Sequence, residues 1–375
     1  MNRLWIRACA ALLLAVMTLM LMTAPKAEPA MNVRASAFAL IDAESGRLLF
    51  GKNENLRLPM ASTTKIMTAL VTLESCALDE MVGIPDEAVG AEGSSMYLER
   101  GESLSVRDLL YGLMLASGND AAVALAVHVG GSVKDFVGLM NVRADSMGLR
   151  STHFITPNGL SAEGHLTTAR ELCLIAREAM KNEDFARIVS TKYYRTETGG
   201  AVRSFKNKNS LLWSYDGAFG IKTGYTMAAG RCLVFGAERN GMRVIGAVLN
   251  CRPMFDEAAR LMDEAFESFV PVTVIGKGTR VFDVYVENSE ECLLEVSAKD
   301  SIIRLMRSNE SALLCTEYEL YPDLSPPIRA GDEVGVLRIR ENGETIGSTA
   351  LVASNTVLPY GYGYWWKLLS KRFAA

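Results

Sequence analysis

The hydrophobic pattern of the chain changes near residues 271–278, and this change divides its 375 residues into two parts. Before it, apolar residues recur at helical spacing in some segments and in short strand-like runs in others. After it, from 279 to 353, only short strand-like runs separated by turns occur. The length also favours two domains. We therefore expect a layered α/β (α+β) unit followed by a small all-β domain.

The first part is expected to contain one sheet flanked by helices from both of its halves. Residues 35–50 alternate as a hairpin, and Asn240-Gly241 is typical of a tight turn between two further strands. Ser105 and Asp108 form a capping pattern at the start of a helix. We expect one helix that begins after Pro59 and a second over 106–116. Further helices are expected from about Asp120, over 168–180 and over 256–269. The later strands are expected over 219–225, 232–238 and 242–249.

The first thirty residues predict an export signal rather than part of the fold. Arg3 and Arg7 precede the uncharged apolar segment 8–22, and small residues follow at 23–27. That apolar run is short for a membrane span, which needs about 20 residues. An uncleaved anchor is the alternative. We expect a mature protein at the outer face of the cytoplasmic membrane or in the periplasm.

The last segment, 357–375, predicts an amphipathic helix. Apolar side chains fall on one helical face, and Lys367, Ser370 and Lys371 fall on the other. Such a helix can lie on a membrane surface; a terminal helix packed on its own protein, or a frayed tail, is the alternative. The predicted division is 1–30, 31–270, 271–356 and 357–375. The apolar face comprises Tyr362, Trp365, Trp366, Leu369 and Phe373.

Charge and cysteine content exclude some functions. The net charge of −4 argues against a nucleic-acid partner, which requires a basic surface. Apart from Cys9, six cysteines remain without a CxxC pair, and the chain has only three histidines. We therefore expect no metal site and mostly free thiols, with a Cys292–Cys315 disulfide as the alternative.

Three short motifs carry residues suited to acyl transfer. Ser62 and Lys65 are one helical turn apart, so a neutral lysine could deprotonate the serine. Ser117-Gly118-Asn119 falls between two predicted helices, and Lys222-Thr223-Gly224 falls in a predicted strand. Singly, each has an ordinary explanation: a capping serine, a turn, and a solubilising lysine on an edge strand. Together, in this order, they predict an active site.

The three motifs and their flanking residues resemble the low-molecular-mass penicillin-binding proteins, serine D-alanyl-D-alanine carboxypeptidases of the S11 peptidase type. The resemblance covers about residues 33–270 and implies a penicillin-binding/β-lactamase-like transpeptidase domain. It implies peptidoglycan stem pentapeptides as substrates, covalent binding of β-lactam antibiotics, and no cofactor. The matching segments are Ala61-Ser62-Thr63-Thr64-Lys65-Ile66, Leu115-Ala116-Ser117-Gly118-Asn119-Asp120, Thr156-Pro157-Asn158-Gly159-Leu160 and Gly220-Ile221-Lys222-Thr223-Gly224-Tyr225-Thr226.

The resemblance also implies roles for the matching residues. Ser62 would attack the carbonyl between two terminal D-alanines, and Lys65 would remove its proton. Ser117 and Asn119 would line the cleft, with Ser117 helping to pass a proton to the departing D-alanine. Lys222 would add positive potential, Thr223 would bind the terminal carboxylate beside Gly224, and the N–H groups of Ser62 and Tyr225 would form the oxyanion hole.

The chain departs from the family pattern at one position, and three other functions also have to be considered. Met254 stands where relatives often have an arginine, and Arg252 is a candidate substitute. A β-lactamase would ordinarily lack the β domain, and Glu163 is followed four residues later by Thr167 rather than by the asparagine of its deacylation element. A D,D-endopeptidase and a penicillin-binding sensor with little turnover also fit the motifs.

Overall fold

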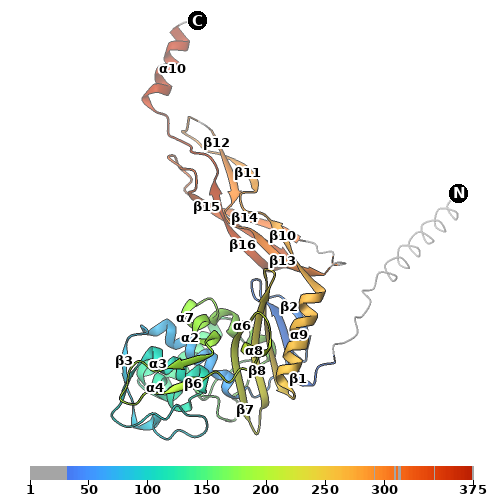
Figure 1. Ribbon diagram of the computed structural model, residues 1–375. Coiled ribbons are helices and arrows are strands. Elements are labelled where there is room, and N and C mark those ends of the chain that lie inside the picture. Colours follow the sequence, from blue (N-terminus) through green and yellow to red (C-terminus); the bar gives the residue numbers. More distant parts are fainter. Residues whose placement is uncertain (1–31, 291, 308–309, 311–313, 342, 374–375) are drawn as a thin grey trace, which may run out of the picture. The chain divides into compact units, whose positions relative to one another are not determined.

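The computed structural model describes residues 32–290, 292–307, 310, 314–341 and 343–373 (Figure 1). The predicted export signal at 1–30 lies outside the described residues. Among the described residues, no single helix is long and apolar enough to cross a membrane. The helices α4 (Asn119–Gly130) and α5 (Val133–Ser146) reach that length and composition only as a pair, and they are bent by 83° at their junction.

A five-stranded antiparallel sheet forms the centre of the first part, in the order β2-β1-β9-β8-β7. The first strand therefore pairs with the last, and Ala37 lies opposite Leu249. Asn240 and Gly241 both have positive φ values, +51° and +75°, as a tight two-residue hairpin turn requires. Both predicted hairpins are confirmed. The strands are β1 (Ala35–Asp42), β2 (Leu48–Lys52), β7 (Ala218–Thr226), β8 (Gly230–Arg239) and β9 (Met242–Cys251).

Helices cover both faces of this sheet. Strand β8 has six consecutive buried residues, so neither of its faces is open to solvent. Helix α6 (Ala169–Ala179) packs on β1 and β9, and α9 (Met254–Ser268) packs on β8 and β9. Figure 1 shows α9 on one side of this sheet and α6 and α4 on the other. The predicted α/β layering is therefore confirmed.

The helical layer is centred on α4, whose first eight residues are all buried. Ser105 accepts a hydrogen bond from the Asp108 N–H at 3.1 Å, as the capping pattern predicted. The predicted helix 106–116 is two elements, because the chain changes to a π-helical turn at Gly112. Helices α5 and α7 were missed from the sequence. The layer comprises α2 (Lys65–Ser75), α3 (Val106–Tyr111), the π-helical turn η3 (Gly112–Ala116), α4, α5 and α7 (Glu183–Ser190).

The second part is all-β, as predicted. Its sheet has the order β11-β12-β16-β15-β14, and a separate pair joins β10 and β13. Strand β10 occupies 269–275, a segment in which the sequence indicated a change of hydrophobic pattern but no strand was predicted. A core of its own, including Leu294, Leu337 and Leu351, holds these strands together. The elements are β10 (Phe269–Ile275), β11 (Arg280–Tyr285), β12 (Leu293–Ala298), β13 (Ile302–Arg307), β14 (Leu314–Leu320), β15 (Glu333–Glu341), β16 (Glu344–Ala353) and the terminal helix α10 (Tyr362–Phe373).

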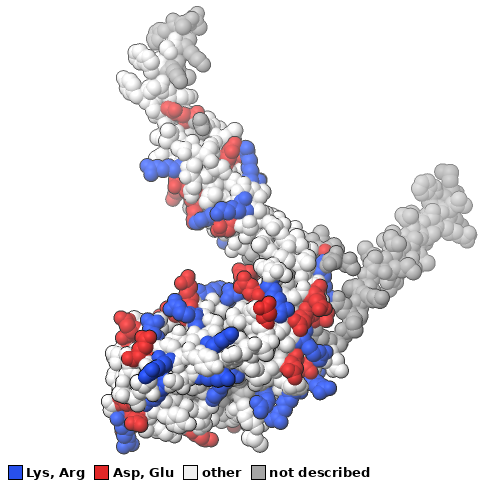
Figure 2. Space-filling model, in the orientation of Figure 1, with Lys and Arg blue, Asp and Glu red and all other residues white. Residues whose placement is uncertain are grey.

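Charged side chains of both signs are interspersed on the face of the molecule drawn in Figure 2. The described residues on that face show no continuous basic surface. Phosphate binding, by contrast, depends on clustered positive charge.

Candidate active site

Ser62 lies in a short 3-10 turn, η1 (Ala61–Thr64), that runs directly into α2. Ala61, Thr63 and Thr64 are buried, whereas Ser62 is half-buried. The hydroxyls of Thr63 and Thr64 donate to backbone oxygens three residues earlier, at 2.6 and 2.8 Å. Ala61 has a φ of +50°, which is costly for a residue with a side chain. The turn is thus fixed on its buried side and presents Ser62 outward.

The amine of Lys65 contacts three oxygen atoms at the start of α2. Its Nζ lies 3.1 Å from Ser62 Oγ, 2.6 Å from Asn119 Oδ1 and 2.6 Å from the Asn158 backbone oxygen. The Lys65 side chain is fully buried. Three segments that are distant in the sequence, around Ser62, Asn119 and Asn158, therefore meet at one nitrogen atom.

Burial lowers the pKa of Lys65 well below its ordinary value, and the positive charges of Lys222 and Lys208 lower this pKa further. A neutral amine has two N–H bonds and one lone pair. Asn119 Oδ1 and the Asn158 oxygen can only accept, so they take both N–H bonds. The lone pair is left for the hydroxyl of Ser62, which can donate its proton to it.

Ser117 and Lys222 form a second contact across the site. Ser117 follows η3 in the left-handed conformation, with φ of +64°, and the Lys222 amine donates to its Oγ at 3.0 Å. Burial, followed by the charge of Lys208, lowers the pKa of Lys222 to about 7. Strand β7 is an edge strand, but Lys222 is 1% exposed. A solubilising role for this lysine is therefore wrong.

Strand β7 passes close to the backbone of the serine turn. A Cβ atom added to Gly224 would lie 3.1 Å from Ser62 N and 3.2 Å from Met60 O, so a side chain there would push strand and turn apart. Thr223, Gly224 and Tyr225 line the same cavity, of about 310 Å³, as Ser62 and Ser117. The structure thus brings all three sequence motifs to one cavity.

Two cationic residues of this cavity were missed from the sequence. Lys208 and Arg231 both line it, and the Lys208 amine donates to Ser94 Oγ at 3.1 Å. Neither belongs to a motif, and no spacing pattern could have identified them. Met254 also lines the cavity, whereas Arg252 is not among its lining residues. Arg252 is therefore not the replacement for the arginine that the resemblance led us to expect.

A buried carboxylate beside the site was also missed. Asp120 is fully buried, and it accepts hydrogen bonds from Ser95 Oγ at 2.6 Å and from the N–H groups of Met96 and Leu98 at 3.0 and 3.1 Å. These contacts hold the loop 92–98 in place through its residues Ser95, Met96 and Leu98. The same loop binds Asn119, because the Ser94 oxygen accepts from Asn119 N at 2.7 Å and the Glu92 oxygen accepts from Asn119 Nδ2. Asp120 therefore positions Asn119 indirectly.

The segment that contains Asn158 is fixed from both sides. Gly159 has a φ of +83°, and a Cβ atom there would lie 2.0 Å from Ala61 O, so only glycine fits. His165 Nδ1 accepts from the Ile155 N–H at 2.9 Å, so the proton of its ring is on Nε2, which donates to Thr64 Oγ1 at 2.8 Å. This contact joins the segment to the serine turn. Burial, followed by the charge of His153, lowers the pKa of His165 to about 4.

The arrangement supports transfer of an acyl group to a hydroxyl. It combines a half-buried serine, a buried lysine of lowered pKa whose amine contacts that serine, a second serine held by a second lysine, and cations that can receive a carboxylate. The described residues that line the cavity include no histidine, cysteine or carboxylate side chain that could form a metal site there.

Comparison with known proteins agrees with this chemistry. Residues 22–252 match the family described as D-alanyl-D-alanine carboxypeptidase, peptidase S11, and residues 269–358 match the C-terminal domain of penicillin-binding protein 5. The chain is 31% identical to the D-alanyl-D-alanine carboxypeptidase DacF of Bacillus subtilis over 338 residues, which is 88% of this chain and 87% of that protein.

Solved structures give the same assignment. Penicillin-binding protein 5 from Haemophilus influenzae aligns with a TM-score of 0.69 and 28% identity, over 89% of this chain and 100% of that structure. The Streptomyces K15 DD-transpeptidase aligns with a TM-score of 0.61 and 38% identity, over 64% of this chain and 99% of that structure. The chain therefore belongs to the peptidase S11 family of serine D-alanyl-D-alanine carboxypeptidases.

Proposed function

We propose that Ser62 is the nucleophile with which this carboxypeptidase removes the terminal D-alanine of a peptidoglycan stem pentapeptide, and that Lys65 is its general base. The observation that carries the proposal is the 3.1 Å contact between Lys65 Nζ and Ser62 Oγ, with both N–H bonds of the amine taken by Asn119 and Asn158. General-base help of this kind contributes about 10²- to 10⁴-fold to a rate.

The reaction has two steps that share the same groups. Ser62 Oγ bonds to the carbonyl carbon of the penultimate D-alanine, and its proton passes to Lys65 Nζ. The peptide C–N bond then breaks, the nitrogen of D-alanine takes up a proton, and an ester remains on Ser62. Water attacks this ester, which releases the shortened peptide and restores the hydroxyl.

Ser117 provides the route for the proton that D-alanine takes up. Its hydroxyl accepts a hydrogen bond from the amine of Lys222 at 3.0 Å, and Ser117 lines the same cavity as Ser62. With a pKa of about 7, Lys222 can exchange a proton near neutral pH. Asn119 keeps Lys65 in place through its amide oxygen.

The terminal carboxylate of the substrate is held by Thr223 and by the cations around it. Lys222 precedes Thr223 on β7 and its amine donates to the Thr223 backbone oxygen at 2.9 Å, and Lys208 and Arg231 line the cavity that Thr223 also lines. Arg231, on the neighbouring strand β8, supplies the guanidinium that Met254 cannot. A planar guanidinium suits a carboxylate because it can donate two parallel hydrogen bonds.

The oxyanion of the intermediate is stabilised by the backbone N–H groups of Ser62 and Tyr225. The proximity of Gly224 to Ser62 N supports this assignment, because it shows how close β7 comes to the serine turn. Removing one donor from such a site typically costs about 3 kcal/mol of transition-state stabilisation. β-Lactams, whose ring amide takes the place of the D-Ala-D-Ala bond, acylate the same serine.

The direct test is release of D-alanine from a pentapeptide that ends in D-Ala-D-Ala. Wild-type protein should release it, and Ser62→Ala should lose both release and labelling by a fluorescent penicillin. Ser161→Ala is a suitable control because Ser161 is an exposed serine that hydrogen-bonds Thr226 rather than Lys65. Release by folded Ser62→Ala would contradict the assignment of the nucleophile.

The main alternative concerns the molecule that accepts the acyl group from Ser62, which is water in hydrolysis and an amine in transpeptidation. The similarity to the Streptomyces K15 DD-transpeptidase makes an amine acceptor a second candidate. Adding an amine acceptor to the same assay and analysing the products by mass spectrometry distinguishes transfer from hydrolysis. Cross-bridged dimers as substrate test endopeptidase activity, a β-lactam alone tests β-lactamase activity, and a stable penicillin adduct without release of D-alanine would indicate a sensor.

The exported location and the membrane contact belong to the same proposal. In α10, Tyr362, Trp365, Trp366 and Leu369 are exposed apolar side chains. An exposed aromatic set of this kind suits the headgroup region of a membrane. Deletion of 360–375 should abolish co-sedimentation with anionic lipid vesicles while D-alanine release persists. Unchanged co-sedimentation would contradict the role of the helix.

A further inference from the structure

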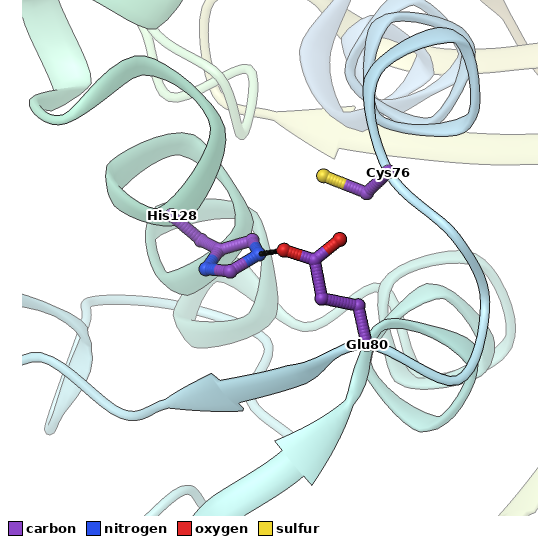
Figure 3. A group of neighbouring side chains, drawn as sticks. All are labelled: Cys76, Glu80 and His128. Atoms are coloured by element: carbon purple, nitrogen blue, oxygen red, sulfur yellow. Dashed lines mark hydrogen bonds and ion pairs between the residues drawn. The ribbon is translucent and has the colours of Figure 1, made fainter.

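Three potential metal ligands from separate elements meet outside the active site (Figure 3). Cys76 directly follows the last residue of α2, Glu80 directly precedes strand β3 (Met81–Gly83), and His128 lies near the end of α4. One ligand atom from each lies within 4.8 Å of the other two, and His128 Nε2 is 2.8 Å from Glu80 Oε1. Cys76 and His128 are half-buried and Glu80 is exposed, so an ion can reach the cluster from solvent.

The backbone that carries these side chains is well fixed. Cys76 N donates to Thr72 O at 2.9 Å, which closes the last turn of α2. Between Cys76 and β3, the oxygens of Leu78 and Glu80 each accept a backbone hydrogen bond at 2.9 Å from the start of α3. Gly131, three residues after His128, caps the end of α4 with a φ of +75°. Little reorganisation of the main chain is therefore needed to close the three ligands around one ion.

The ligand types identify the class of ion. A thiolate, an imidazole and a carboxylate are the groups that bind Zn²⁺, at about 2.3, 2.0 and 2.1 Å. Two ligands that are each about 2.0 to 2.3 Å from a tetrahedral ion are about 3.5 Å apart, so closure requires rotamer changes rather than movement of helices. The charges of a thiolate and a carboxylate together balance the charge of a divalent ion.

We propose that Cys76, Glu80 and His128 form a binding site for one zinc-like divalent ion, with water as the fourth ligand. On binding, the ion forms a bond to Cys76 Sγ, and the thiol proton is released to solvent. No sequence pattern indicated such a site, because the ligands are spread over 53 positions and follow no metal-binding motif. The expectation of no metal rested on the absence of such a motif and on the small number of histidines.

The position of the site indicates a structural role. Helix α2 begins at Lys65 and α4 begins at Asn119, and the proposed ligands lie at the opposite ends of these helices. With 1.5 Å of rise per residue, the 11 residues of α2 place the ion about 16 Å from the Lys65 end. An ion there would join the far ends of two helices that carry active-site residues, without contacting the substrate.

Cobalt provides the first test, because a thiolate bound to Co²⁺ gives a charge-transfer absorption band. Reduced, chelator-treated protein should develop this band with one equivalent of Co²⁺ and lose it when Zn²⁺ is added. Cys76→Ala should lack the band, and His128→Ala and Glu80→Gln should weaken Zn²⁺ binding at least 10-fold in competition with a chromogenic chelator. Cys315→Ala and His153→Ala are matched controls, because both side chains are exposed elsewhere.

Alkylation of the wild-type protein gives a test that needs no variant. Zn²⁺ should protect Cys76 from iodoacetamide, measured on the Cys76 peptide by mass spectrometry, while Cys315 stays reactive. Zn²⁺ should also raise the Tm of wild type but not of Cys76→Ala, and all of these variants should release D-alanine at the wild-type rate. The proposal is wrong if no cobalt band forms, if the band survives Cys76→Ala, or if Cys76 is alkylated equally with and without Zn²⁺.

Discussion

Replacing Asp120 by asparagine tests how the active site is held in place. The carboxylate accepts from Ser95, Met96 and Leu98, and its Oδ1 also accepts from Ala121 N at 2.9 Å. An asparagine has one acceptor oxygen, so in one orientation its NH₂ group faces the Leu98 N–H and in the other the Ala121 N–H. Leaving one such buried donor unpaired, and losing charge assistance for the rest, costs about 3 kcal/mol of the free energy of unfolding.

Asp120→Asn should also change the kinetics of D-alanine release. The loop it holds contacts Asn119 through Ser94 and Glu92, so Asn119 and Lys65 lose their fixed relative position. A displacement of about 1 Å at reacting groups lowers kcat by about 10- to 100-fold. The negative charge of Asp120 raises the pKa of Lys65. Its removal should therefore move the acid limb of the pH–rate profile to lower pH.

Asp135→Asn is the matched control for this experiment. Asp135 occupies the first turn of α5 as Asp120 does in α4, but it is exposed and contacts only its capping serine. Its replacement should change stability by no more than about 0.5 kcal/mol and leave the pH profile in place. Urea unfolding and D-alanine release at several pH values supply both readouts. An Asp120→Asn protein with wild-type stability, kcat and pH profile would refute the reasoning.

Three further predictions follow from contacts at or near the site. Gly224→Ala should lower D-alanine release and penicillin acylation together while the protein stays folded, because its Cβ would meet Ser62 N at 3.1 Å; unchanged acylation would show that β7 can move away without consequence. The folded-state pKa of His165, about 4, is below its ordinary 6.5, so the unfolded chain takes up the proton first and stability is lost as the pH falls from about 6.5 to 4. This loss amounts to about 3 kcal/mol and should disappear in His165→Gln, as measured by urea unfolding at pH 7 and 4.5; an equal loss in the variant would assign it to another group. Gly138→Ala, at an exposed position of α5 with no atom within 4 Å of the new Cβ, should raise the free energy of unfolding by about 0.5 to 1 kcal/mol, and a lower Tm would contradict this.

Local sequence signals predicted the elements that depend on local chemistry. The Asn240-Gly241 turn and the Ser105 cap are both present, because each depends on residues within a few positions. The prediction of one helix over 106–116 was only partly right, because the chain changes to a π-helical turn at Gly112. At this point the side chain of Met96 lies against the glycine. A contact with a distant loop cannot be read from a periodic pattern.

The motif residues could be predicted, but the groups that tune them could not. Ser62, Lys65, Ser117, Asn119 and Lys222 were found because they occur in short motifs. Lys208, Arg231 and Asp120 reach the site from a loop, a strand and a helix start, and their residue types are common on any surface. Their importance follows from burial and from distances across the fold.

The most direct test of the central assignment is to locate the covalent adduct formed with a β-lactam. Ring opening adds the whole antibiotic to the serine oxygen, so intact mass spectrometry should show one added antibiotic mass, and digestion should place it on Ser62. Lys65→Ala should slow acylation by orders of magnitude at unchanged folding, because the proton of Ser62 then has no acceptor. An adduct on another residue, or one that forms at the wild-type rate in Ser62→Ala, would contradict the account.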